Sequence, residues 1–282
     1  MSAEPVARTE ALDPVERSIW ERIPRPLSVL GLVALIVLLW QVAVWLEVTS
    51  QLVLPPPLEV LEETVDLVEN MLRGGFVLDN SWITLKEIVL GFLLAAAAGI
   101  GLGIVVGETA FGRIVLMPFL VAVNAAPKVA FAPIFVAWFG FGIGAKVAMG
   151  AFIAFFPLLI DTAAGLAGTD PDQAKLFRAI RASRRQTFLK LKLPNALPFI
   201  FAGLKTAAVL AVVGAIVGEF LGGGRGLGGL IRVASSQLAI DRVFAFVLIL
   251  SLIGYAAYAS VAWLERRIVF WRHSEVLPGA GM

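Results

Sequence analysis

The sequence predicts an all-α polytopic membrane protein with about six transmembrane helices. Hydrophobic residues make up 59% of its 282 residues, and its mean hydropathy is +0.88. A soluble domain has roughly 45–50% apolar residues, and a helix that spans the bilayer needs about 20 predominantly apolar residues. The composition, together with several apolar runs of about that length, excludes a soluble globular protein.

Six apolar stretches predict the transmembrane spans. Around them we expect a polar N-terminal tail at 1–26, a transmembrane domain at 27–264 and a polar C-terminal tail at 265–282. No apolar core of a signal peptide precedes the first span, so we expect that span to remain uncleaved. The predicted spans are residues 27–46, 82–106, 114–139, 145–166, 199–220 and 243–264.

The third span is predicted to be kinked. Asn124, Pro127 and Pro133 interrupt its apolar run, and proline removes a backbone donor from a helix. The carbonyl groups that the kink frees must bond to neighbouring protein or to water in a cavity. Elsewhere, glycines at four-residue spacing predict faces where helices pack closely. They are Gly99, Gly103, Gly107, Gly214, Gly218 and Gly222.

The distribution of basic residues predicts the orientation in the membrane. With six spans and the N-terminus inside, the segments 1–26, 107–113, 168–198 and 265–282 lie on one side and hold 15 of the 23 lysines and arginines. Loops rich in lysine and arginine stay in the cytoplasm. We therefore expect a multi-pass protein of a bacterial inner membrane with both termini cytoplasmic.

The residue inventory excludes several kinds of chemistry. There is no cysteine, and the single histidine, His273, lies in the C-terminal tail, so disulfides, thiolate sites and histidine metal sites are not expected. No Gly-x-x-x-x-Gly-Lys-Ser/Thr motif is present to hold nucleotide phosphates. We predict a chain that is not an enzyme and has no cofactor, no metal site and no nucleic-acid partner.

Residues 168–198 form a strongly charged segment between two apolar blocks. It holds seven basic residues and two aspartates, while Leu176, Ile180 and Phe188 recur at roughly helical spacing. This pattern predicts one or two short amphipathic helices outside the bilayer. Such helices could contact a protein partner or the anionic headgroups of the lipid bilayer.

The end of this segment resembles a known coupling motif. The run from Leu191 to Pro198, LKLPNALP, is similar to the end of the cytoplasmic coupling motif of binding-protein-dependent ABC importer permeases. In that family the motif starts with Glu-Ala-Ala, continues to a glycine and ends Ile-x-Leu-Pro, and its two short helices dock on a separate ATPase subunit. Counting back from Leu193-Pro194, the family's glycine falls on Arg181 and its glutamate on Lys175.

The resemblance assigns the coupling role to residues 168–198, hereafter the coupling loop. Arg181 lacks the freedom of glycine at positive φ, so we expect the turn to differ in detail from that of the family. Lys175 reverses the charge that would face the ATPase. The residues assigned to coupling are Lys175, Arg178, Ala179, Ile180, Arg181, Ala182, Ser183, Arg184, Leu193 and Pro194.

Other stretches extend the resemblance over nearly the whole chain beyond residue 27. Residues 127–142, 155–165 and 218–231 are similar to the nitrate/sulfonate/taurine-type branch of these permeases. The resemblance implies a type I-like ABC importer permease fold and a homodimeric pore. It also implies two ATPase subunits and a substrate-binding protein that delivers a small solute, such as a nitrate, sulfonate or taurine-like anion.

Three further functions remain open. They are import of a thiamine-precursor pyrimidine or other small nutrient by the same family, a stand-alone secondary transporter or channel, and a membrane scaffold. A secondary transporter would favour an internal repeat, and none is evident between the two halves of the sequence.

Three ionisable residues within the apolar runs are candidates for the solute pathway: Lys128, Asp161 and Glu219. Charged groups inside a membrane are costly and often functional. Lys128 could attract an anionic solute, or it could cap carbonyls freed by the kink. Asp161 and Glu219 could line the pathway, or each could pair with a lysine on another helix. Lys205 is expected to extend to the cytoplasmic interface.

Overall fold

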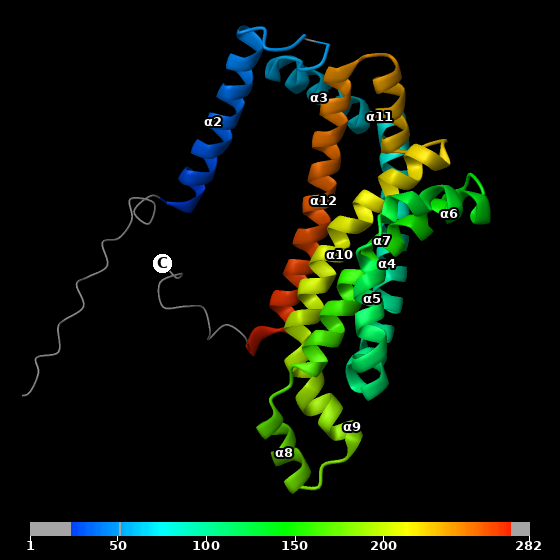
Figure 1. Ribbon diagram of the computed structural model, residues 1–282. Helices are drawn as coiled ribbons and strands as arrows, with labels where there is room; N and C mark the ends of the chain where they lie inside the picture. The colour runs from blue at the N-terminus through cyan, green and yellow to red at the C-terminus, as the bar shows by residue number, and fades with distance from the viewer. Residues whose placement is uncertain (1–23, 51, 272–282) are drawn as a thin grey trace, which may run out of the picture. The chain divides into compact units, whose positions relative to one another are not determined.

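The computed structural model describes residues 24–50 and 52–271 (Figure 1), and within these ranges every regular element is a helix. The chain divides into two units, residues 1–58 and 59–282. In the first unit, α2 (Arg25–Trp45) is apolar on all sides, as expected of a helix surrounded by lipid. Most of the two predicted tails, residues 1–23 and 272–282, lies outside the described residues.

The second unit is built around α7 (Ile143–Ala167). More than half of the most apolar stretch of this helix is buried inside the protein. The helix packs against α4 (Phe76–Glu108) and α10 (Leu193–Gly222), and α12 (Ile240–Ile268) packs on α10. Figure 1 shows these four helices side by side. The shared core of α4, α7 and α10 consists mainly of alanines, whose small side chains allow the helix backbones to approach closely.

Glycines show the relative direction of the packed helices. A Cβ on Gly91 of α4 would lie 3.3 Å from the backbone nitrogen of Ala151 in α7, and one on Gly107 would lie 3.0 Å from the carbonyl oxygen of Ala163. The two helices therefore run parallel. A Cβ on Gly214 of α10 would meet Gly150 at 2.5 Å, whereas the beginning of α10 lies at the end of α7, so these two helices are antiparallel.

Because α4 and α7 are parallel, the chain between them must return along the length of α4. It does so through a π-helical turn (Gly112–Leu116), α5 (Met117–Asn124), a 3₁₀ turn (Lys128–Phe131) and α6 (Ala132–Phe139). The two halves of this segment meet at an angle of 87°. The segment is thus one broken crossing, and the break follows Asn124, where the sequence predicts the kink.

Shorter helices complete the second unit. The acidic helix α3 (Pro57–Leu72), which begins at the boundary between the units, precedes α4. Helix α11 (Leu227–Ser236) follows a glycine-rich turn after α10 and packs against α12, α10 and α4. Two short helices, α8 (Pro171–Ala179) and α9 (Arg184–Thr187), lie between α7 and α10.

Helix α10 begins earlier than predicted. The sequence places the start of the fifth span at residue 199, but α10 starts at Leu193 and continues through Pro194 and Pro198. A proline in the first turn of a helix removes no intrahelical hydrogen bond, so Pro194 is compatible with a helix start at this point. The coupling loop therefore ends about five residues before Pro198.

Candidate functional site: the coupling loop and the buried charges of the bundle

The first helix of the coupling loop is capped at both ends. The Asp170 side chain accepts a hydrogen bond from the backbone of Asp172 (2.8 Å) at the start of α8. At its end the Arg181 amide donates to the carbonyl of Arg178 (3.0 Å) and the Ala182 amide to that of Phe177 (2.9 Å). This pair of bonds is the Schellman motif, which requires a left-handed residue at the Arg181 position.

Arg181 adopts the conformation that favours glycine. Its φ is +54°, in a region that costs a residue with a side chain roughly 1–2 kcal/mol. Arg181 thus has a positive φ even though its side chain makes that conformation costly. The helix cap imposes the left-handed conformation, and the arginine adopts it. Arg181 is also the position on which the family's glycine falls when the motif is counted back from Leu193-Pro194.

The second helix of the loop starts with a capping box. The Ser183 hydroxyl accepts from the Gln186 amide (3.2 Å), and the Gln186 side chain accepts from the Ser183 amide (2.8 Å). Helix α9 then passes through a π-helical stretch, Phe188–Lys192, directly into α10. Leu193 and Pro194 form the first turn of α10. Because this run is unbroken, residues 184–222 form a single long helical element.

The coupling loop is attached to the bundle at its second half. Phe188 packs on a small core of Leu166, Ala196 and Ile200, and Lys192 forms a bidentate ion pair with Glu108 at 2.9 Å. The first half is free of the bundle. Leu176 and Ile180 are 60% and 65% exposed.

The exposed surface of the coupling loop combines apolar and basic side chains. Lys175 is held by Asp172 at 2.7 Å. Of the residues assigned to coupling, seven are exposed: Lys175, Arg178, Ala179, Ile180, Arg181, Ser183 and Arg184, whereas Ala182, Leu193 and Pro194 are half-buried. An exposed pair of large apolar residues among arginines is typical of a protein-binding surface.

Lys128 lies at the break of the third crossing. Its Nζ donates to the carbonyl of Asn124 (2.8 Å) and lies 5.5 Å from the ring centre of Phe156. The lysine thus caps a carbonyl at the end of α5, which is one of the two roles that the sequence leaves open.

Neither predicted carboxylate pairs with a lysine among the described residues. Asp161 is half-buried on α7, with no hydrogen bond or ion pair to any other described residue. Lys205, which was expected to extend to the cytoplasmic interface, forms an ion pair with Glu265 of α12 at 2.7 Å.

Glu219 is fully buried at the far end of α10. Its Oε1 accepts from the Thr84 hydroxyl of α4 (2.6 Å), and its Oε2 accepts from the amides of Gly228 and Gly229 at the start of α11. The Thr84 oxygen in turn accepts from the amide of Leu227 (2.8 Å). Glu219 therefore joins α10 to α4 and caps the N-terminus of α11, and it does not face an open pathway in this structure.

A second pair of buried charges lies beside Glu219. Lys146 of α7 and Glu87 of α4 are 4% and 1% exposed and form an ion pair at 2.9 Å. The Lys146 ammonium also donates to the carbonyl of Arg225 (2.7 Å) in the glycine-rich turn. The sequence prediction named neither residue as a candidate, although both fall within the predicted spans 82–106 and 145–166. The signal that could have identified them is a single charge within or beside an apolar run.

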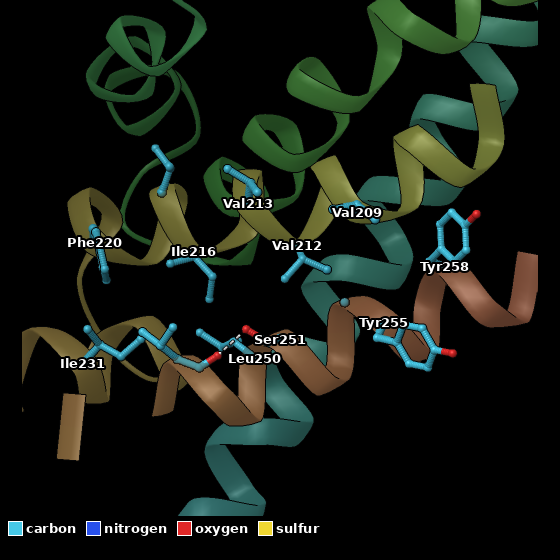
Figure 2. A pocket seen from close by; sticks show the side chains of 13 residues that line it. Val209, Val212, Val213, Ile216, Phe220, Ile231, Leu250, Ser251, Tyr255 and Tyr258 are labelled. Atoms are coloured by element: carbon cyan, nitrogen blue, oxygen red, sulfur yellow. Dashed lines mark hydrogen bonds between the residues drawn. The ribbon is translucent and has the colours of Figure 1, made fainter. Parts of the chain in front are cut away.

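An apolar cavity of about 520 Å³ lies between α10 and α12 (Figure 2). Valines and other aliphatic side chains form most of its wall, and the few polar atoms come from Ser251, Tyr255 and Tyr258. None of the predicted pathway residues Lys128, Asp161 and Glu219 lines it. The cavity therefore offers no charged group to an anionic solute.

The family model for the inner membrane component of binding-protein-dependent transport systems matches residues 99–270, more than half of the chain, including the coupling loop. The chain belongs to this family. Its members are membrane permease components that work with separate ATPase subunits and a substrate-binding protein, and they are not themselves enzymes. The chain is accordingly a multi-pass membrane protein.

Several relatives match along most of their length. The formylaminopyrimidine transport permease ThiX of Halalkalibacterium halodurans is 34% identical over 86% of this chain and 94% of its own. The putative aliphatic sulfonates transport permease SsuC of Bacillus subtilis is 32% identical over 86% of each. The taurine transport permease TauC of Escherichia coli is 29% identical over 88% and 90%.

The fold is also found in a solved transporter. A chain of the MetNI methionine ABC transporter in an inward-facing conformation superimposes with a TM-score of 0.53. The match covers 67% of this chain and 96% of that one, at 19% identity. This similarity confirms the expected ABC importer permease fold.

Proposed function

We propose that this chain is the transmembrane subunit of an ATP-driven importer, coupled to a separate ATPase subunit through residues 168–198. The observation that supports this most strongly is the structure of the coupling loop. Two capped helices present Leu176 and Ile180 among basic side chains, away from the bundle. The second helix continues directly into α10, so a force on the loop acts on a transmembrane helix.

The proposed orientation places the coupling loop and both termini in the cytoplasm, where ATP is available. The excess of lysine and arginine on that side supports it, since the coupling loop alone holds seven of the 23 basic residues. The acidic helix α3 and the glycine-rich turn before α11 then lie on the outer side, where a substrate-binding protein delivers solute.

The proposed solute is small, either a nitrate, sulfonate or taurine-like anion or a related organic nutrient such as a pyrimidine. Relatives of similar identity have names that refer to a formylaminopyrimidine, aliphatic sulfonates and taurine, so permease similarity does not separate these solutes. We propose that the binding protein selects the solute. A second copy of this chain would complete the pore.

Reconstitution tests this function. The chain is placed in liposomes with the ATPase and binding protein encoded beside it, and uptake is followed with and without ATP. Leu176→Asp with Ile180→Asp should abolish co-purification of the ATPase and ATP-dependent uptake, because it places charges in the proposed contact. Asp66→Asn, on the exposed face of α3, is the matched control and should change neither. Uptake that persists after ATP depletion would instead indicate a secondary transporter or channel.

A further inference from the structure

The end of the bundle away from the coupling loop holds a buried polar cluster, which we define as Thr84, Glu87, Lys146 and Glu219. Its members come from α4, α7 and α10, and all are at most 4% exposed. Asn80 of α4 extends it by accepting from the amide of Gly226 (2.7 Å). The polar cluster and Asn80 therefore bond to the backbone at five successive residues, 225 and 226 in the turn after α10 and 227 to 229 at the start of α11.

The glycines around the polar cluster leave room for its charged side chains. A Cβ on Gly218 would lie 2.8 Å from the Cα of Lys146, and one on Gly228 would lie 2.8 Å from the Glu219 carboxylate. Gly226 has φ of +129° and directly adjoins the same carboxylate. The turn can adopt this conformation against two buried charges only because these positions have no side chain.

Packing alone does not account for the polar cluster. Burying an ion pair costs several kcal/mol per ion in desolvation, and apolar residues of similar volume are often as stabilising or more so. Within a membrane protein, buried ionisable groups are also costly and are usually functional. One oxygen, Oε2 of Glu87, accepts no hydrogen bond in the described structure, so the polar cluster is not arranged for maximal stability.

The polar cluster is connected to the coupling loop by one continuous helical element. Residues 184–222 make up 39 residues of helix, about 58 Å at 1.5 Å per residue. The second half of the coupling loop, from Arg184, forms the start of this element, and Glu219 lies in its last turn. Figure 1 shows α8 and α9 at one end of the bundle and α11 at the other.

A small displacement of α10 would disrupt the polar cluster before it disrupts the apolar packing. The hydroxyl of Thr84 lies 2.6 Å from Glu219, and such bonds are made at about 2.5–3.0 Å. A displacement of α10 by about 1 Å away from Thr84 would lengthen this bond from 2.6 Å to about 3.6 Å and break it. Alanine and valine side chains in the same interface can slide that far and keep their contacts.

We propose that Glu87, Lys146 and Glu219 are positioning residues that hold the turn at 223–226 and the start of α11 against α4 and α7, and that release them when the coupling loop moves α10. This inference rests on the proposed function. Lys146 is central to it because its ammonium joins a carboxylate on α4 to the backbone of the turn. The arrangement has two states, since the bonds are either made together or lost together.

The absence of cysteine from the chain permits a direct test. Leu227→Cys places a thiol at a buried position at the start of α11 and keeps the backbone amide that bonds to Thr84. The complete transporter, with ATPase and binding protein, is labelled with a membrane-impermeant maleimide in vesicles. We expect ATP to increase the labelling rate about tenfold, a typical size for coupling between two sites.

Adding Lys146→Met should make labelling fast without ATP, within about twofold of the ATP-bound rate, because methionine fills the space without bonding to Glu87 or Arg225. Glu219→Gln is the second variant if the first does not assemble, and the same loss of ATP dependence is expected. Lys205→Met is the matched control, since it removes an ion pair of α10 that lies outside the polar cluster and should retain the tenfold response.

Three results would overturn the proposal: equal labelling of Leu227→Cys with and without ATP, an unchanged ATP response in Lys146→Met, or loss of the response in Lys205→Met. ATP-dependent uptake is measured in the same vesicles. If uptake is present but labelling does not respond, only the role of the polar cluster is wrong. If the assembled transporter shows no ATP-dependent uptake, the proposed function is wrong.

Discussion

Replacing Gly214 with alanine should destabilise the central helix pair. The new Cβ would lie 2.5 Å from the Cα of Gly150, while ordinary contact begins near 3.4 Å, so α7 and α10 must separate by 3.4 − 2.5 = 0.9 Å. Overpacking of this kind lowers the free energy of unfolding by about 1–3 kcal/mol. The higher helix propensity of alanine offsets about 1 kcal/mol of this loss. The difference is about 0–2 kcal/mol, and we expect a net loss in the upper half of that range, about 1–2 kcal/mol, because the three nearest atoms that the new Cβ would meet are all backbone.

Thermal unfolding in detergent measures the effect. A loss of 1–2 kcal/mol corresponds to a fall in Tm of about 2–8 °C for a chain of this size. Gly101→Ala is the matched control, because no atom lies within 4 Å of the added Cβ, and it should leave Tm unchanged or raise it. If Gly214→Ala were as stable as Gly101→Ala, the close backbone contact between α7 and α10 would be wrong.

Three other substitutions test the site. Arg181→Gly should stabilise the coupling loop by about 0.5–1 kcal/mol, the relief of left-handed strain less the flexibility of glycine, and should leave ATPase co-purification equal or stronger; weaker binding would contradict the assigned register. Lys192→Glu should lower Tm and ATP-dependent uptake, because it breaks a partly exposed ion pair with Glu108 that is worth about 1 kcal/mol or less. Adding Glu108→Lys should restore both. If the double variant did not recover, the ion pair would not be the cause of the loss. Lys128→Met should remove the cap on α5 and weaken uptake of an anionic solute, seen as a higher KM; an unchanged KM would exclude Lys128 from the pathway.

The coupling loop was the part of the site that the sequence predicted best. Its signals are local: a proline and an aspartate at the start of α8, a serine three residues before a glutamine at α9, and Leu193-Pro194 at the end. Caps and amphipathic spacing act within a few residues, so the sequence pattern predicts two short helices outside the bilayer. Arg181 has a positive φ although its side chain disfavours that conformation. The backbone hydrogen bonds at the end of the preceding helix, rather than the preference of the residue itself, decide its conformation.

The partners of the buried charges could not be predicted from the sequence. Glu219 was identified as an ionisable residue within an apolar run, and pairing with a lysine was one of the two roles left open for it, but it pairs with none of the described lysines. It accepts hydrogen bonds from Thr84, 135 positions away, and from the backbone of α11, and Lys146 pairs with Glu87 instead. A sequence shows that a charge in an apolar run needs a partner. It does not show which of several candidates lies across the helix interface.

Residue patterns were enough to predict the all-α membrane class, the kink in the third span and the position of the coupling loop, because hydropathy, proline and apolar spacing act over short stretches of chain. The fold was needed to establish that α4 and α7 run parallel, and that Gly218 and Gly228 adjoin Lys146 and Glu219. Small residues permit close approach of many helix pairs. The approach that occurs depends on contacts between segments far apart in the chain.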